Sequence, residues 1–233
     1  MKKLLWPLLT ALALNGCASL APAPANPEAA AMTRTTQTAM TPDDALARLK
    51  SGNIRFASGR MLARDLPAQV KASSQGQHPF ASVISCIDSR AAPELVFDQG
   101  IGDVFSTRIA GNVVNEDMLG SLEYATRVAG SRLVVVLGHT SCGAIKGACD
   151  DVVMGNLTGL LGKIKPAVSS VQFAGDRSSK NASFVELVAE ANVRRTVQDV
   201  LTRSAILREM HDKGQIRVVG AMLDVATGKV TWY

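Results

Sequence analysis

Apolar residues along this chain follow two patterns, continuous runs and helical repeats. Near-continuous apolar runs are typical of strands buried on both faces, and we expect such strands at 80–85 and 132–138. Two further strands are expected at 104–109 and 216–223. Apolar residues spaced three or four apart predict helices at 41–58, 66–73, 118–129, 144–149, 157–173 (interrupted at Pro166) and 184–210. A last short strand is expected at 229–232, after the turn at Thr227-Gly228.

The alternation of strands with helices predicts an α/β fold. We expect a mostly parallel central sheet flanked by helices, with an N-terminal helical arm. The folded domain is predicted to span residues 41–233, because Thr41-Pro42-Asp43-Asp44 combines an N-cap, a proline in the first turn and two acids. In such sheets, ligands bind beyond the carboxyl ends of the strands.

The first forty residues read as an export signal followed by a tether. Lys2 and Lys3 precede an apolar stretch, residues 4–14, that is too short to span a bilayer. The stretch ends in Leu14-Asn15-Gly16-Cys17, which resembles a bacterial lipobox, so residues 1–16 are expected to be removed and Cys17 lipidated. Residues 17–40, rich in Pro, Ala and Thr, are expected to form a flexible tether.

This leader implies a location as well as an anchor. Ala18, rather than an aspartate, follows Cys17, which by analogy with lipoprotein sorting predicts a periplasmic protein held to the outer membrane by lipid. An ordinary secretory signal, cut after about Ala18, is the alternative. Nucleic-acid binding is not expected: the net charge of +5 falls to +3 without Lys2 and Lys3 (23 basic against 20 acidic residues), and no run of five Lys or Arg occurs.

Three potential zinc ligands follow two of the predicted strands. Cys86 follows the run at 80–85, and His139 follows the run at 132–138, with Cys142 three residues later. Two thiolates and an imidazole leave one tetrahedral position open, as in catalytic zinc sites. In an exported protein, four cysteines also raise the alternative of two disulfides. Cys142 and Cys149, seven residues apart, leave a redox role open, although no Cys-x-x-Cys occurs.

The motifs around these residues resemble those of the β-class carbonic anhydrases. Residues 86–90, Cys-Ile-Asp-Ser-Arg, match the family's Cys-x-Asp-Ser-Arg motif, and residues 139–143 match its His-x-x-Cys-Gly motif. Residues 108–112 are similar to the family's Arg-Asn-x-x-Asn stretch, with Ile109 where asparagine is common. The helix segment 121–125 and the strand pair 220–230 also match. The resemblance covers roughly residues 41–233.

The resemblance implies reversible hydration of CO2 to bicarbonate and a proton at a zinc site. Zn²⁺ would be held by Cys86, His139 and Cys142, with water or hydroxide in the fourth position. Asp88 would accept the remaining proton of that hydroxide in a hydrogen bond, and Arg90 would keep Asp88 ionised and off the metal.

The resemblance also implies a substrate pocket shared between subunits of a homodimer or higher homo-oligomer. Gln77 matches a glutamine that reaches substrate from the neighbouring subunit, and Phe105 and Tyr124 match apolar pocket walls. Gly143 is placed with them as a substrate-binding position. Some bacterial relatives close their site with a tryptophan at the position of Val83, so here we expect an open site with Asp88 paired to Arg90.

Two other functions remain open at this point. A relative of this fold could hydrolyse a sulfur analogue such as carbonyl sulfide with the same metal site. A non-catalytic, lipid-anchored zinc scaffold is the other, although a merely structural zinc site would not need Asp88, Arg90 or Gln77.

Overall fold

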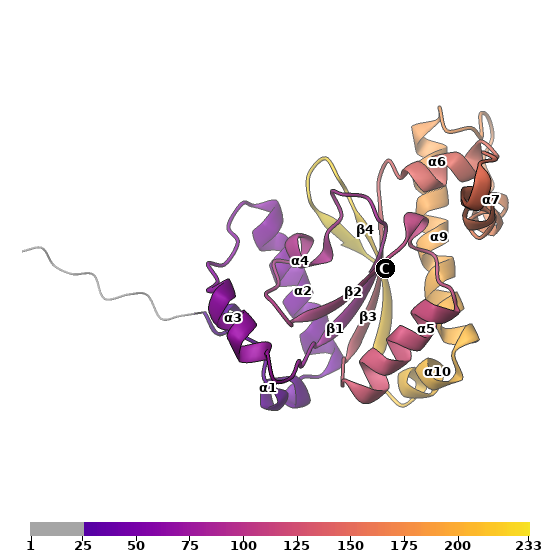
Figure 1. Cartoon of the computed structure of the whole chain (residues 1–233). Coiled ribbons are helices and arrows are strands. Elements are labelled where there is room, and N and C mark those ends of the chain that lie inside the picture. The colour runs from indigo at the N-terminus through magenta and orange to yellow at the C-terminus, as the bar shows by residue number, and fades with distance from the viewer. Residues whose placement is uncertain (1–25) are drawn as a thin grey trace, which may run out of the picture.

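A five-stranded sheet forms the centre of the computed structural model, which describes residues 26–233. Its strands, in the order β2-β1-β3-β4-β5 across the sheet, are β1 (Ala81–Ser85), β2 (Val104–Arg108), β3 (Leu133–His139), β4 (Arg217–Leu223) and β5 (Val230–Trp232). The first four are parallel, and β5 pairs with β4 in the antiparallel sense (Figure 1). The predicted α/β fold with a mostly parallel sheet is confirmed.

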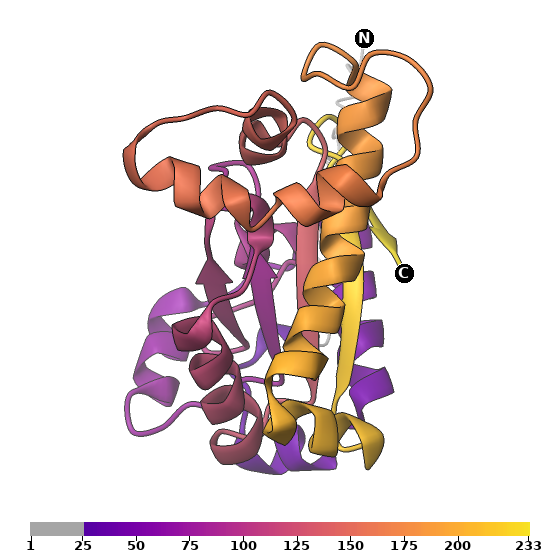
Figure 2. The same cartoon turned by 90° about the vertical axis from the view of Figure 1, so that its right-hand side faces the viewer.

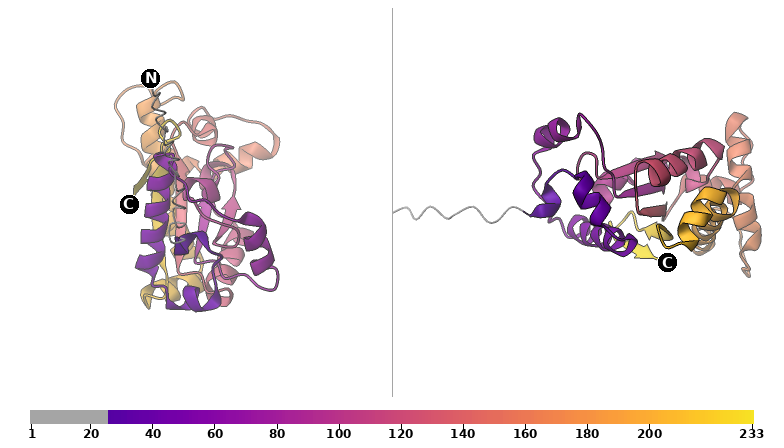
Figure 3. Two further views of the ribbon diagram at one scale, coloured as in Figure 1. Left: turned by 90° about the vertical axis from the view of Figure 1, so that its left-hand side faces the viewer. Right: turned by 90° about the horizontal axis from the view of Figure 1, so that it is seen from below.

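Helices cover both faces of this sheet (Figure 3). One face packs against α2 (Pro42–Ala57) and α4 (Pro93–Val96), and the other against α5 (Glu116–Glu123), α9 (Ala182–Arg203) and α10 (Ala205–Asp212). Successive strand residues pack against the helices on opposite faces, because side chains alternate across a sheet. Val83 of β1 therefore lies in the core beneath α2, and Ile84 lies in the core beneath α9.

Three short helices lie across one end of the molecule (Figure 2). They are α6 (Gly143–Cys149), α7 (Gly155–Gly162) and α8 (Lys165–Ser170), and α8 packs against α9. Because α6 begins directly after β3, this end of the molecule is the carboxyl edge of the parallel strands.

The N-terminal arm differs from the expected tether. Residues 26–40 form a turn of 3-10 helix (Pro27–Ala29) and helix α1 (Arg34–Ala39), followed later by α3 (Leu66–Ser73) as expected. Gln37 is buried and its amide donates to the carbonyls of Pro79 and Ala129, at 2.7 and 2.8 Å. Those two bonds hold α1 on the domain, so a flexible tether over residues 26–40 is wrong. The signal segment, Cys17 and residues 17–25 lie outside the described residues.

Two predicted helices are divided. The helix expected at 184–210 ends at Arg203, and Ser204 takes an extended conformation to become the N-cap of α10, accepting from the N–H of Leu207 at 3.1 Å. The interruption expected at Pro166 comes earlier, since α7 ends at Gly162 and Pro166 lies in the first turn of α8. Within residues 26–233, no helix has both the length and the apolar content needed to cross a bilayer.

The helix expected at 118–129 changes type partway. Helix α5 ends at Glu123 and continues as a turn of π-helix over Tyr124–Val128, where the N–H of Ala129 donates to the carbonyl of Tyr124 at 2.9 Å. The short helix α4 was not predicted at all, because four residues are too few to show a helical repeat.

Candidate metal centre

The three predicted metal ligands meet at the carboxyl edge of the sheet. Cys86 follows β1, His139 ends β3, and Cys142 is the N-cap of α6. Strands β1 and β3 are adjacent and in register, with Ser85 opposite Leu137, so the residues that follow them lie together. The ligand atoms all lie within 4.8 Å of one another, and the two sulfurs are 4.0 Å apart.

The imidazole of His139 is oriented for metal binding. Its Nδ1 donates to the carbonyl of Thr140 at 2.9 Å, which leaves the lone pair of Nε2 free as a ligand. His139 is 1% exposed, and its Nε2 is buried with no hydrogen-bond partner among the described residues. A buried polar atom without a partner is costly, and a metal ion at this position would satisfy it.

The electrostatics of the two thiols also favour a cation. The hydrogen bond from Cys142 lowers the pKa of the Cys86 thiol, with further contributions from His139 and from the N–H of Gly111 at 3.4 Å. The same hydrogen bond, together with burial, raises the pKa of Cys142. A divalent cation between the two sulfurs would stabilise both as thiolates. A buried set of two thiolates and one imidazole matches the donor preference of Zn²⁺.

Asp88 and Arg90 form a bidentate ion pair beside these ligands. Arg90 Nε and NH2 donate to the two carboxylate oxygens of Asp88 at 2.9 and 2.8 Å, and the Arg90 N–H adds a third bond at 3.0 Å. These bonds hold the pKa of the Asp88 carboxyl well below its usual range. Asp88 Oδ2 also lies 3.8 Å from His139 Nε2, so the ionised carboxylate faces the position that the metal would occupy.

Arg108 was not predicted as a site residue, although it opens one of the matched motifs. Its Nε donates to the carbonyl of Cys86 at 3.0 Å, and its NH2 donates to the carbonyl of Asp88 at 2.6 Å. Arg108 therefore holds the backbone that carries one metal ligand and the carboxylate. Its contacts could not be read from the motif, because they are made to backbone atoms.

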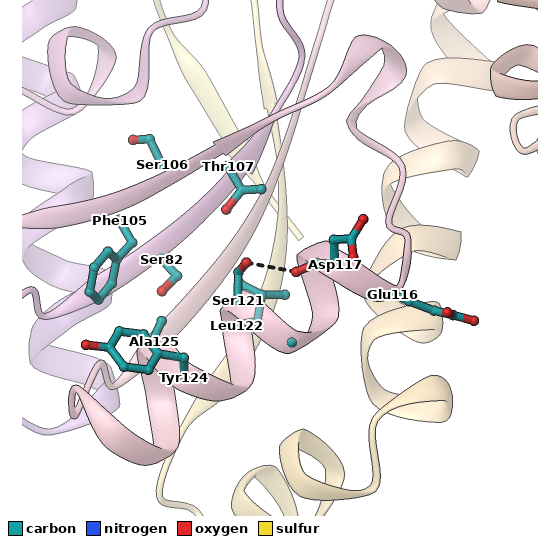
Figure 4. A pocket seen from close by; sticks show the side chains of 11 residues that line it. Ser82, Phe105, Ser106, Thr107, Glu116, Asp117, Ser121, Leu122, Tyr124 and Ala125 are labelled. Carbon is teal, nitrogen blue, oxygen red and sulfur yellow. Dashed lines mark hydrogen bonds between the residues drawn. The ribbon is translucent and has the colours of Figure 1, made fainter. Parts of the chain in front are cut away.

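The predicted pocket walls lie elsewhere (Figure 4). Phe105 and Tyr124 face each other edge to face, with ring centroids 6.4 Å apart. They line an open cavity of about 750 Å³ between β2 and α5, together with Ser82. Tyr124 remains 53% exposed. An aromatic side chain that lines a pocket formed by one chain alone is usually more buried than this.

The structure does not bring this pocket to the metal ligands of the same chain. Phe105 is paired with Ser82, four residues before Cys86, which is about 13 Å along the strand. Gln77 precedes β1 and lies in a separate shallow groove with Ile101. Of the four predicted substrate-binding residues, Gly143 alone adjoins the metal centre, as the exposed first residue of α6.

The chain is similar to known carbonic anhydrases in sequence and in fold. A family model described as carbonic anhydrase matches residues 81–230. Carbonic anhydrase 2 of Mycobacterium tuberculosis is 37% identical over 185 residues, which cover 78% of this chain and 87% of that protein. The fold is similar to that of the β-carbonic anhydrase CafA of Aspergillus fumigatus, with a TM-score of 0.61 at 26% identity, over 82% of this chain and 89% of that one.

A further solved structure is described as a tetramer. It is one of two tetrameric β-carbonic anhydrases from Sordaria macrospora, with a TM-score of 0.63 at 24% identity. The alignment covers 78% of this chain and 93% of that one.

Proposed function

The chain belongs to the carbonic anhydrase family and is a zinc enzyme that hydrates CO2 reversibly, and we propose here which residues perform the reaction and where it takes place. Cys86, His139 and Cys142 hold the zinc. When bound, Zn²⁺ supplies a nucleophile at neutral pH, since it lowers the pKa of a coordinated water from about 15.7 to roughly 7 in the three-histidine carbonic anhydrases.

Asp88 orients the attack on CO2, and the bidentate pair with Arg90 is the observation that carries this role. An ionised carboxylate can only accept a hydrogen bond, so Asp88 would accept one from the nucleophile, which leaves an oxygen lone pair directed at the carbon of CO2. Arg90 donates a hydrogen bond to each carboxylate oxygen of Asp88. These bonds keep Asp88 charged and prevent it from becoming a fourth metal ligand.

The Asp88–Arg90 ion pair distinguishes an enzyme from a non-catalytic zinc scaffold. A closed structural site satisfies its metal with protein ligands alone, and a charged pair at 2.8 Å beside an open position would have no use there.

We propose further that the active enzyme is a homo-oligomer whose substrate pocket is completed across an interface. Phe105, Tyr124 and Gln77 lie too far from the metal ligands of their own chain to line the same pocket. The open cavity beside the exposed ring of Tyr124 is suited to receive the carboxyl edge of a second copy. In that arrangement each chain supplies pocket walls to the metal centre of its partner.

The reaction is proposed to take place in the periplasm, with the enzyme tethered to the outer membrane by lipid on Cys17. Support for this location comes from the leader sequence, residues 1–17. Cys17→Ser should release the domain from the membrane fraction or block processing. Mass spectrometry of the wild-type N-terminus is the direct measurement, and an unmodified, soluble wild-type protein would favour ordinary secretion.

The central experiment is stopped-flow CO2 hydration by the mature enzyme, with zinc measured on the same sample. We expect stoichiometric zinc and rapid hydration, and Asp88→Asn should keep the zinc while losing most of the rate. Sulfide release from carbonyl sulfide is measured in parallel. Zinc-loaded protein that releases sulfide faster than it hydrates CO2 would replace the proposed substrate.

A further inference from the structure

Helix α9 carries a buried amide, on Asn192, that donates to the backbone next to the metal centre. Asn192 is 1% exposed, and its Nδ2 donates to the carbonyl of Gly111 at 2.7 Å. The bond joins residues 81 positions apart in the sequence. A polar side chain in an apolar core costs free energy unless it is hydrogen-bonded, so this contact accounts for the presence of Asn192 among the valines of α9.

Gly111 connects this amide to a zinc ligand. Its N–H donates to the sulfur of Cys86 at 3.4 Å, while its carbonyl accepts from Asn192. The N–H and the carbonyl belong to successive peptide groups, and Gly111 is the joint between them. That joint is in the left-handed region, at φ 71° and ψ 18°, where glycine alone is unstrained.

The second of these peptide groups is held at both ends. Besides the bond from Asn192, the N–H of Asn112 donates to the carbonyl of Ile109 at 3.0 Å. Asn112 is itself left-handed, at φ 43°, which is an uncommon conformation for a non-glycine residue. Two successive left-handed residues persist only where the surroundings hold them. The bond from Asn192 is therefore part of what keeps the Gly111 N–H directed at Cys86.

Apolar side chains fill the space beside the Cα of Gly111. A Cβ added at this position would lie 2.5 Å from Cδ1 of Ile164 and 3.4 Å from Cβ of Ala144. Both neighbours are apolar, so neither can accept or donate a hydrogen bond to the Gly111 peptides. The amide of Asn192 is the only side-chain partner of the Gly111 carbonyl in the part of the chain that the structure describes.

We propose that Asn192 is a positioning residue of the metal centre: it holds the Gly111 carbonyl so that the Gly111 N–H remains on the Cys86 thiolate. A hydrogen bond to a thiolate stabilises its negative charge and orients the sulfur toward the metal. Groups that hold metal ligands in this way typically contribute 10–100-fold in metal affinity. The inference rests on the zinc centre of the proposed function, but its readout is metal binding rather than turnover.

The test compares zinc affinity in Asn192→Ala, Asn192→Leu and wild type, by competition with a chelator at pH 8. Both variants remove the donor, and Asn192→Leu does so without opening a cavity, because leucine has a similar branched shape and no polar side-chain atom. We expect zinc affinity to fall by about tenfold or more in both. In the Co²⁺-substituted protein, the thiolate-to-cobalt charge-transfer band should move to lower energy, because a thiolate without its hydrogen bond is easier to oxidise.

Val188→Ala is the matched control, one turn earlier on α9 and fully buried in the same core. It should lower the melting temperature as the Asn192 variants do, but leave zinc affinity and the cobalt band unchanged. Wild-type affinity and an unshifted band in a folded Asn192 variant would overturn the proposal, and so would an equal change in Val188→Ala.

A measurement on the wild type keeps the proposal testable if the variants do not fold. In protein loaded with an NMR-active cadmium isotope, the Gly111 amide proton should show scalar coupling to the metal through the Cys86 sulfur. Its hydrogen exchange should also be slow. A Gly111 amide without that coupling, or one that exchanges as fast as a surface amide, would show that Asn192 holds no such bond in place.

Discussion

The metal centre and the pocket at Tyr124 both adjoin β1 but differ in how far one chain completes them. At the carboxyl edge, Cys86, His139 and Cys142 are 4% exposed or less, and their donor atoms already converge. Near the other end of β1 and β2, Phe105 and Tyr124 line a cavity of about 750 Å³ that remains open, with Tyr124 53% exposed.

This difference follows from what each region requires. Metal ligation needs donor atoms at fixed distances, and adjacent parallel strands that end in register supply them within one fold. An apolar pocket needs exclusion of water, and a second protein surface can provide that. The metal-binding donor atoms therefore meet within one chain, whereas the substrate pocket is proposed to need two.

Among the substitutions that test this difference, loss of a metal ligand should have the largest effect on zinc content, activity and stability. Cys142→Ala should bind no stoichiometric zinc, show no CO2 hydration and unfold at a lower temperature, because metal binding contributes to folding free energy. Elemental analysis and thermal unfolding measure the two effects. Cys149→Ala is the control, since Cys149 is a half-buried thiol outside the metal centre, and it should keep both zinc and activity. Full zinc in Cys142→Ala would refute the ligand assignment.

Substitutions in the Asp88–Arg90 ion pair should affect catalysis but not metal binding. Asp88→Asn and Arg90→Ala should keep zinc and lower the hydration rate by about 10²-fold or more, the scale of a positioned acid–base group. Stopped-flow assays on metal-analysed samples measure this. Arg194→Ala breaks a solvent-exposed ion pair with Glu190 and should leave the rate unchanged. Wild-type rates in either variant of the Asp88–Arg90 ion pair would remove that residue from the mechanism.

Subunit mixing tests whether the pocket is shared between chains. Phe105→Ala should lower kcat/KM by roughly tenfold, the lower range for an apolar pocket contact. Co-expression of Cys142→Ala chains with Phe105→Ala chains should restore activity, because a mixed pair contains one metal centre facing an intact Phe105. Tandem purification on two tags isolates the mixed species. Val153→Ala, at an 82% exposed residue, is the control for Phe105→Ala and should lose nothing. If the mixed oligomers are no more active than the oligomers of either variant alone, the metal centre and the Phe105 pocket wall must act within one chain.

The smallest expected effect is the pH dependence that Arg90 imposes on Asp88. Because Arg90 lowers the pKa of Asp88, the pair stabilises the fold above the ordinary carboxyl pKa of about 3.9, and that contribution is lost as the pH falls through the lower, folded-state value. Arg90→Ala should therefore raise the Asp88 pKa toward 3.9, as measured by carboxyl NMR titration. Asp98, buried between Arg55 and Arg64, should titrate as in wild type. An unchanged Asp88 titration would mean that Arg90 does not control its charge.

Local patterns in the sequence predicted the strands and the carboxyl edge of the sheet. The apolar run before Cys86 and the one before His139 mark β1 and β3, and their polar ends mark where chemistry can lie. These predictions succeed because buried parallel strands need continuous apolar runs and because residues at strand ends share one edge. Composition misled the prediction for residues 26–40. Their Pro/Ala/Thr-rich sequence predicted a flexible tether, but the two hydrogen bonds of Gln37 hold this segment on the domain.

The sequence by itself determined the kind of fold, the donor atoms of the metal centre and the identity of the charged pair, because these depend on residue type and on spacing within short segments. The tertiary structure alone decided which distant residues support or complete the site. Asn192 reaches Gly111 across 81 residues, and Phe105 lies far from Cys86 although 19 positions separate them. Such contacts depend on the packing of α9 and on strand register, which no local pattern of hydrophobic residues encodes.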